Sequence, residues 1–129
     1  MKTKLNYFFA ATSVVAIICS IYAFSKPAAG KTEFLQVTAV ESVVPGGLGR
    51  SRMITISEAG KMDEINLENF FSMVGINFGN IRQNDQMITD KISDLTNMGW
   101  ELKFVSTGVY AADKSTGIFI TRYTFSRQK

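Results

Sequence analysis

Histidine is absent from this chain of 129 residues, which holds only one cysteine, two prolines and one tryptophan. Without histidine, Ser–His and Cys–His catalytic pairs are excluded and the commonest transition-metal ligand is missing. The single cysteine, Cys19, lies in an apolar N-terminal segment, so the rest of the chain has no thiol for a disulfide or a zinc site. Acylation of Cys19 is disfavoured because the large Ile18 precedes it. No cofactor and no metal site are predicted, and a hydrophobic core has to stabilise the fold.

An uncharged and mostly apolar stretch, LNYFFAATSVVAIICSIYAFS at residues 5–25, follows Lys2 and Lys4. A basic start before an apolar run is typical of a secretory signal peptide, and Ala23 and Ser25 suit a cleavage site after Ser25. The stretch is also long enough to cross a bilayer as a helix. Two interpretations stay open: a cleaved signal peptide with a periplasmic or secreted product, or a membrane anchor with the domain facing the periplasm. In both cases the rest of the chain is predicted to be exported.

The positive charge of the chain is largely a property of this leader. Of the 14 lysines and arginines, two precede residue 5, whereas all 11 acidic residues follow residue 25. The exported part is therefore almost neutral, and its arginines are spread along the chain. Such a balance lacks the basic patch of a nucleic-acid-binding protein, so nucleic acid is not an expected partner.

Small and turn-forming residues predict a linker at residues 26–32, and hydrophobic periodicity predicts one domain at residues 33–129. Period-two patterns and β-branched residues predict strands, and short stretches rich in glycine or polar residues separate them. In the last hairpin, Trp100, Leu102 and Phe104 alternate with polar residues and are expected to be buried. The predicted strands are 33–44, 51–57, 62–65, 100–110 and 117–127.

Two helices are predicted between the third and fourth strands. Leu67, Phe70, Phe71 and Val74 have the spacing of one helix face, with Asn66 as N-cap and Gly75 as the C-terminal stop. A second amphipathic segment covers residues 85–98, with Asn84 as N-cap and Gly99 as the stop. The order β-β-β-α-α-β-β predicts an α+β fold, in which two helices pack on one face of a single antiparallel sheet of about five strands.

The segment ITDKISDLTNMGWELKFVS, followed by a strand ending in ITRYTFSR, resembles a family of small bacterial proteins built around a domain of unknown function. The resemblance covers residues 84–127 and depends on a helix, a Gly-Trp-Glu-Leu step at residues 99–102 and an aromatic and basic last strand. The region VTAVESVVPGGLGRSRMI is similar to exported proteins of Bacteroidetes-type bacteria. The resemblance implies the fold and carries no catalytic residues.

The stretch PGGLGRSR at residues 45–52 has three glycines and two arginines. It lacks the Lys-Ser/Thr of a phosphate loop and the third glycine of a dinucleotide fingerprint, and no helix follows it. A loop between two strands explains the glycines. The functional alternative is a contact of Arg50 and Arg52 with an anion or an acidic partner.

A second candidate surface is the aromatic stretch FFSMVGINF at residues 70–78. Such a stretch is more often core, but Phe70, Phe71, Ile76 and Phe78 would form an interface for a protein partner or a second copy if they were exposed.

The densest acidic cluster, Glu58, Asp63, Glu64 and Glu68, offers the only evident enzymatic chemistry, a pair of carboxylates acting on a glycan. Strand alternation places Asp63 and Glu64 on opposite faces, which favours a solvated turn instead. The leading hypothesis is therefore a non-enzymatic binding or structural module of the cell envelope, and a carboxylate-dependent hydrolase is the alternative.

Overall fold

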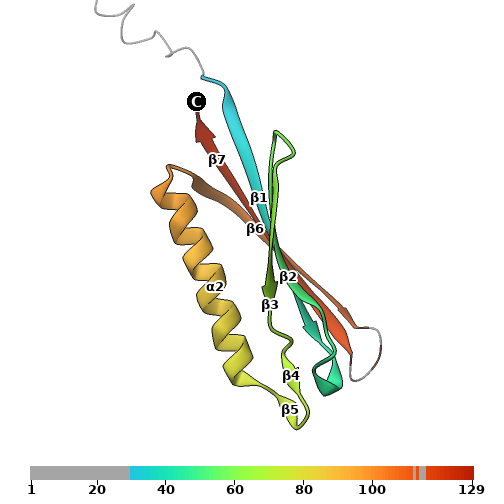
Figure 1. Cartoon of the computed structure of the whole chain (residues 1–129). Coiled ribbons are helices and arrows are strands. Elements are labelled where there is room, and N and C mark those ends of the chain that lie inside the picture. The colour runs from blue at the N-terminus through green and yellow to red at the C-terminus, as the bar shows by residue number, and fades with distance from the viewer. Residues whose placement is uncertain (1–29, 112, 114–115) are drawn as a thin grey trace, which may run out of the picture. The chain divides into compact units, whose positions relative to one another are not determined.

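The computed structural model describes residues 30–111, 113 and 116–129. Five long strands and one helix dominate it, and their order along the chain is shown in Figure 1. A 3₁₀ turn, η1 (Pro45–Gly47), lies between the first two strands. The other elements are β1 (Thr32–Val43), β2 (Ser51–Ser57), β3 (Met62–Leu67), β4 (Phe71–Ser72), β5 (Gly75–Ile76), α2 (Phe78–Asn97), β6 (Glu101–Ala111) and β7 (Gly117–Gln128).

The five long strands form one antiparallel sheet in the order β3-β2-β1-β7-β6. Its centre is the pair of β1 and β7, which stay in register from Thr32 opposite Gln128 to Val43 opposite Gly117. Because β1 and β7 are the first and last strands, the two ends of the domain meet, and Lys129 N donates to Lys31 O over 2.9 Å. The predicted α+β class and the antiparallel sheet are confirmed.

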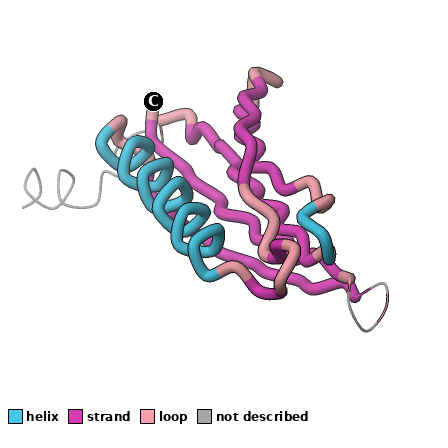
Figure 2. The backbone as a smooth tube through the Cα atoms, turned by 60° about the horizontal axis from the view of Figure 1, so that its bottom comes forward, coloured by secondary structure: helices cyan, strands magenta, loops and turns pink. Residues whose placement is uncertain are grey.

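Alternation along the strands gives the sheet two unlike faces. Leu35, Val37 and Ala39 of β1 are buried, as are Met53 of β2 and Phe125 of β7. These side chains lie in one cluster with residues of α2, and Figure 2 shows the helix running along one face of the sheet. From the helix, Ile88 and Leu95 complete this core, together with Leu67 and Trp100. The opposite face is called the open face below, because no helix of the described residues packs on it.

Only one of the two predicted helices exists. The stretch predicted as a helix over residues 67–74 instead contains the end of β3 and the small hairpin of β4 and β5. Leu67 pairs with Ser51 in the large sheet, so the first residue of the expected helix face belongs to a strand instead. Gly75 has a φ of 120° and helps the chain reverse after Met73 and Val74, instead of ending a helix. Long-range pairing therefore overrides a short helical pattern.

The helix that does form begins earlier than predicted. Asn77 is the N-cap, and its Oδ1 accepts from the backbone N–H groups of Gly79 and Asn80. Asn84, expected to be the cap, is fully buried inside the helix. The C-terminal prediction is confirmed, since Gly99 has a φ of 81° directly after the last turn. In the left-handed region glycine has no Cβ penalty.

Strand β6 contains an irregularity that the sequence pattern concealed. The register with β7 shifts between Leu102, opposite Phe125, and Phe104, opposite Thr124. A bulge at this point reverses the alternation, so Phe104 lies on the open face and not beneath the helix. Trp100 is buried as predicted, but Leu102 is more than one-third exposed. The predicted burial of Phe104 is wrong.

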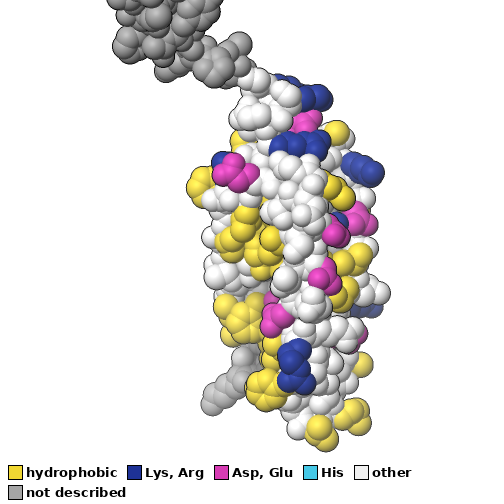
Figure 3. All heavy atoms as spheres, turned by 90° about the vertical axis from the view of Figure 1, so that its left-hand side faces the viewer, with side chains coloured by type: hydrophobic (Ala, Val, Ile, Leu, Met, Phe, Trp, Pro, Cys, Tyr) yellow, Lys and Arg dark blue, Asp and Glu magenta, His cyan; other side chains and the backbone are white. Residues whose placement is uncertain are grey.

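The helix covers only part of its own side of the sheet. Viewed from that side, the surface shows apolar side chains among charged ones (Figure 3). Val105 and Val109 of β6, which alternate with open-face residues, are both exposed. The sheet is therefore incompletely covered even where the core lies.

The chain divides after Gly30, and residues Lys31–Lys129 form a unit that contains the whole core described above. The predicted leader at residues 5–25 and most of the linker at 26–32 lie outside the described residues. Within residues 30–111, 113 and 116–129, no helix is long and apolar enough to cross a membrane.

Candidate functional site: the open face of the sheet

The glycine-rich loop at residues 45–50 is shaped by backbone needs. Gly46 and Gly47 have φ values of 75° and 73°, which side chains of L-residues rarely adopt. Gly49 has a different role, because a Cβ there would overlap Asn69 Oδ1 and Ser42 Oγ. The glycines therefore serve a tight turn and a close approach between two chain segments.

Asn69 is the buried residue whose side chain lies against Gly49. Its Oδ1 accepts from Ser42 Oγ over 3.2 Å and from the Val44 N–H over 3.1 Å. Its Nδ2 donates to the carbonyls of Val44 and Phe71 over 2.8 and 2.7 Å. The buried Ser51 Oγ lies 2.9 Å from Ser42 Oγ and extends the network. This buried amide fastens the loop to the segment after β3.

The two arginines of the loop differ in their surroundings. Arg52 lies in β2, where its Nε is 2.7 Å from Glu64 Oε1 and its Nη1 donates to Ser51 O over 3.0 Å. Arg50 precedes the strand and is exposed. An anion would have to compete with Glu64 for Arg52, so an anion contact by this pair stays a prediction without geometric support.

The predicted apolar surface at residues 70–78 is divided between core and solvent. Phe70 is half-buried and its ring centroid lies 5.8 Å from that of Phe119. Phe71 is also half-buried in β4. Ile76 and Phe78 are exposed, but they lie at the small hairpin and the first helical turn. The four residues do not form one continuous exposed strip, and their role in partner binding stays a prediction.

Three of the four acidic residues proposed for hydrolysis are engaged in separate ion pairs. Asp63 Oδ2 is 3.2 Å from Lys91 Nζ, and Glu58 Oε1 is 3.0 Å from Lys31 Nζ. Together with the Arg52 pair of Glu64, these contacts leave no two carboxylates facing one another in this cluster. Among the described residues, no group of three or more acidic side chains is arranged to hold a metal ion.

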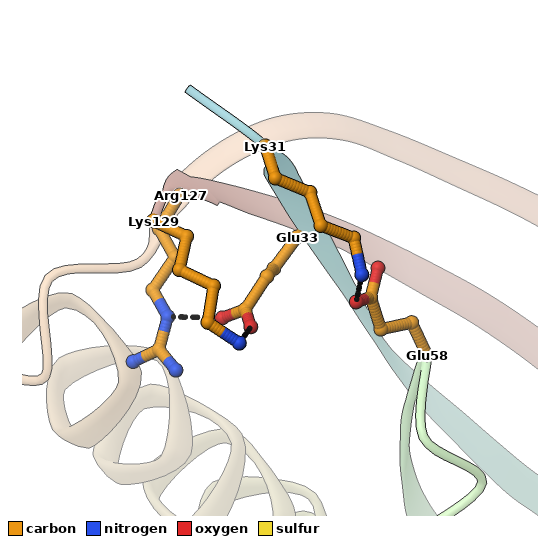
Figure 4. A network of polar contacts seen from close by, with 5 residues as sticks. All are labelled: Lys31, Glu33, Glu58, Arg127 and Lys129. Carbon is orange, nitrogen blue, oxygen red and sulfur yellow. Dashed lines mark hydrogen bonds and ion pairs between the residues drawn. The ribbon is translucent and has the colours of Figure 1, made fainter.

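A network of charges joins the ends of β1 and β7 (Figure 4). Glu33 Oε2 is 2.9 Å from Arg127 Nε, and Glu33 Oε1 is 3.0 Å from Lys129 Nζ. Hydrogen bonds from Lys129 and Arg127 hold the pKa of Glu33 below its usual range. The Arg127 guanidinium also lies over the Trp100 ring, 4.4 Å from its centroid. This network closes the end of the sheet and explains part of the basic character of the last strand.

A second polar cluster lies beneath the first half of α2. Asn84 Oδ1 accepts from the Glu68 N–H over 2.7 Å, and Nδ2 donates to Glu68 O over 2.9 Å and to Glu41 Oε1 over 3.1 Å. Burial raises the pKa of the Glu41 carboxyl; the Asn84 hydrogen bond opposes this shift and the charge of Asp85 adds to it. Burial also raises the pKa of Tyr123, and Glu41 and Asp85 add to the shift. Asn84 thus replaces a missing strand partner for Glu68, which is a structural role.

The open face is the largest feature that sequence reasoning missed. The register places apolar side chains from all five strands on it, and the most exposed are Phe104 at 70%, Tyr110 at 64% and Met62 at 63%. A shallow depression of about 320 Å³ lies between Phe34 and Ile56. The apolar members of the face are Phe34, Val40, Ile54, Ile56, Met62, Phe104, Tyr110, Ile118 and Ile120.

The sequence did contain a sign of this face. In β2 and β7 both alternating sets are partly apolar: Ile54 and Ile56 alternate with Met53, and Ile118 and Ile120 alternate with Phe119. A sheet with one face in water has polar residues in one of the two sets. Apolar residues in both sets indicate that the second face also needs a cover.

Comparison with models of known protein families and with curated protein sequences finds no match for this chain. The resemblance across residues 84–127 therefore stays a prediction. Its Gly-Trp-Glu-Leu step has a structural explanation in the positive φ of Gly99 and the burial of Trp100.

Proposed function

We propose that this chain is an exported, non-enzymatic binding module that contacts another protein of the cell envelope through the open face of its sheet. The observation that carries the proposal is the apolar, uncovered character of that face, to which all five long strands contribute. Exposed apolar side chains gathered on one uncovered face of a sheet usually mark an interaction site. Export is supported only by the sequence of residues 1–25 and is part of the proposal.

The chemistry of the partner follows from the charges on the open face, where Arg52 and Glu64 already form an ion pair with each other and Arg122 is the arginine that remains for a partner. Arg122 is exposed on the central strand β7, opposite Thr38 of β1 and Ser106 of β6. Within residues 30–111, 113 and 116–129, no acidic side chain forms an ion pair with it. An apolar surface that presents a carboxylate toward Arg122 would complement the face, and the pair would gain strength as water is excluded around it.

Location remains part of the same proposal, with two alternatives. A cleaved leader gives a mature protein that starts at Lys26 in the periplasm or the medium, whereas a retained leader gives a membrane protein that starts at Met1. N-terminal sequencing of the protein from soluble and membrane fractions distinguishes them. The hydrolase alternative has no supporting geometry, and Asp63→Asn with Glu64→Gln is expected to change no glycan-degrading activity.

The proposal is tested with variants of exposed residues, which leave the core intact. Arg122→Glu and Ile56→Lys change the open face, while Arg82→Glu and Met98→Lys place the same charges at exposed positions elsewhere on the surface. The tagged full chain is expressed in the cells that carry this gene, and envelope proteins that copurify in stoichiometric amount are identified. One protein should be recovered with the wild type and both controls, and it should be lost from both open-face variants.

Melting temperatures of the four variants show whether the fold is preserved. A partner that is retained by Arg122→Glu and Ile56→Lys, or lost equally from the controls, would refute the assignment of the open face.

A further inference from the structure

Strand β6 is an edge strand that lacks the usual protection beyond its bulge between Leu102 and Phe104. It ends the sheet beyond β7, and each of its 11 residues is exposed. After Lys103, the segment FVSTGVYA at residues 104–111 has no charge and no proline. Natural sheet edges usually carry charged residues or proline, because an unprotected edge can pair with a strand of another chain. The opposite edge, β3, is shorter and carries Asp63 and Glu64.

Both faces of this edge are apolar. Phe104 and Tyr110, 70% and 64% exposed, lie on the open face, whereas Val105 and Val109, 54% and 65% exposed, lie on the helix side. Valine and aromatic residues favour strands that are covered by neighbours. The composition therefore suits an interior strand better than the edge position that β6 has in a single copy.

We propose that β6 pairs antiparallel with β6 of a second copy around a two-fold axis at Thr107, which joins the two sheets into one of ten strands. An antiparallel strand pair related by a two-fold axis is self-complementary, since the same segment supplies both sides. Residues that face each other in an antiparallel pair point to the same side of the sheet, and side chains alternate along each strand. The two-fold axis must therefore pass through a residue, because an axis between two residues would pair side chains of opposite sides.

The axis at Thr107 gives the most complementary pairs. Phe104 faces Tyr110 of the second copy on the open face, and Val105 faces Val109 on the helix side; each pair occurs twice. Aromatic pairs and pairs of β-branched residues are the stabilising cross-strand combinations. An axis at Gly108 would instead place Ser106 opposite Tyr110 and Thr107 opposite Val109. The sequence of β6 is therefore close to symmetrical in chemistry about Thr107.

The pairing does not depend on the function proposed above. Phe104 and Tyr110 belong to both surfaces, but the partner contact is tested at Arg122 and Ile56 on inner strands, whereas the dimer is tested on the helix side of the edge strand. In the dimer both α2 helices lie on the same side, and the open faces form one continuous surface. Variants of the inner strands test the partner contact and variants of the edge test the dimer, so the failure of one proposal can be distinguished from the failure of the other.

Cysteine cross-linking tests the axis directly. Residues 26–129 contain the whole core and no native cysteine, so Thr107→Cys introduces the only thiol. Facing residues in an antiparallel pair have Cα atoms about 4.5–5.5 Å apart, within the range for a disulfide. Val105→Cys is the matched control on the same side of the sheet, because the two Val105 residues of the dimer would lie about 14 Å apart. We expect a covalent dimer from Thr107→Cys only, under mild oxidation.

Charge variants test the predicted neighbours. In Val105→Lys with Val109→Lys, every helix-side pair at the edge becomes Lys opposite Lys, and sedimentation should show a monomer. In Val105→Glu with Val109→Lys, each pair becomes Glu opposite Lys, and the dimer should be retained. Ile56→Lys, on β2, should stay dimeric. A monomeric wild type, equal cross-linking at residues 105 and 107, open-ended aggregates, or identical behaviour of the two double variants would each overturn the proposal.

Discussion

A single methyl group added at Gly49 should disrupt the loop more than any other small change near it. An ideal Cβ would lie 2.8 Å from Asn69 Cγ and closer still to Asn69 Oδ1 and Ser42 Oγ. Both neighbours are buried, so the methyl group displaces the Asn69 amide from its four hydrogen bonds to Ser42, Val44 and Phe71. At about 1 kcal/mol for each bond, and with partial repair by water, Gly49→Ala should cost roughly 2–4 kcal/mol.

For a unit of about 100 residues this cost lowers the melting temperature by roughly 10–25 °C, which urea and thermal unfolding followed by circular dichroism can measure. Gly108→Ala is the matched control, because its added Cβ meets nothing within 4 Å and its φ is not positive. Asn69→Ala should cost a similar amount as Gly49→Ala, and the double variant much less than the two single costs combined, since both act on one network. A Gly49→Ala protein as stable as the Gly108→Ala control would refute this reasoning.

Three further changes have expected outcomes that thermal unfolding can check. Burial holds the pKa of Glu41 above its value in the unfolded chain, so stability should fall as pH rises from about 4.3 through the raised pKa. In Glu41→Gln the side-chain carbonyl still accepts from Asn84, so this variant should lose less stability over that pH range and melt at a higher temperature than the wild type at pH 7. Glu33 has the opposite sign, so Glu33→Gln should destabilise at pH 7 and converge with the wild type as pH falls through the lowered pKa. Trp100→Ala removes a buried ring and the stacking surface of Arg127, and should cost about 3–5 kcal/mol.

The strands were predictable because their pattern is local and repeated. Residues 51–57 and 117–127 alternate over their whole lengths, and the structure has strands at Ser51–Ser57 and Gly117–Gln128. The helix start was not predictable in the same way. Asn77 and Asn84 are both good capping residues by type, and only the backbone of Glu68, distant in sequence, decides that Asn84 is buried.

The candidate site was less accessible to sequence reasoning, for two physical reasons. The bulge after Leu102 moves Phe104 to the open face, and a bulge leaves no mark in a simple alternation. Arg52 was a reasonable candidate for an anion contact, but its occupation by Glu64 depends on the pairing of β2 with β3. In both cases the strand was predicted correctly, but the sequence does not show which residue of the adjacent strand lies opposite.

A single helix among the described residues explains why much of this sheet has to be covered by other protein surfaces. Five strands spaced about 4.8 Å apart span roughly 19 Å, while one helix with its side chains is about 10 Å wide. The described part of the chain has one such helix, so part of one face and all of the other remain without a helical cover. The residues expected to form another helix instead make the β4–β5 hairpin and fasten the glycine loop through Asn69. The apolar residues of β6 and the open face therefore face water in an isolated copy, a cost that a second copy at the edge and a partner on the face would remove.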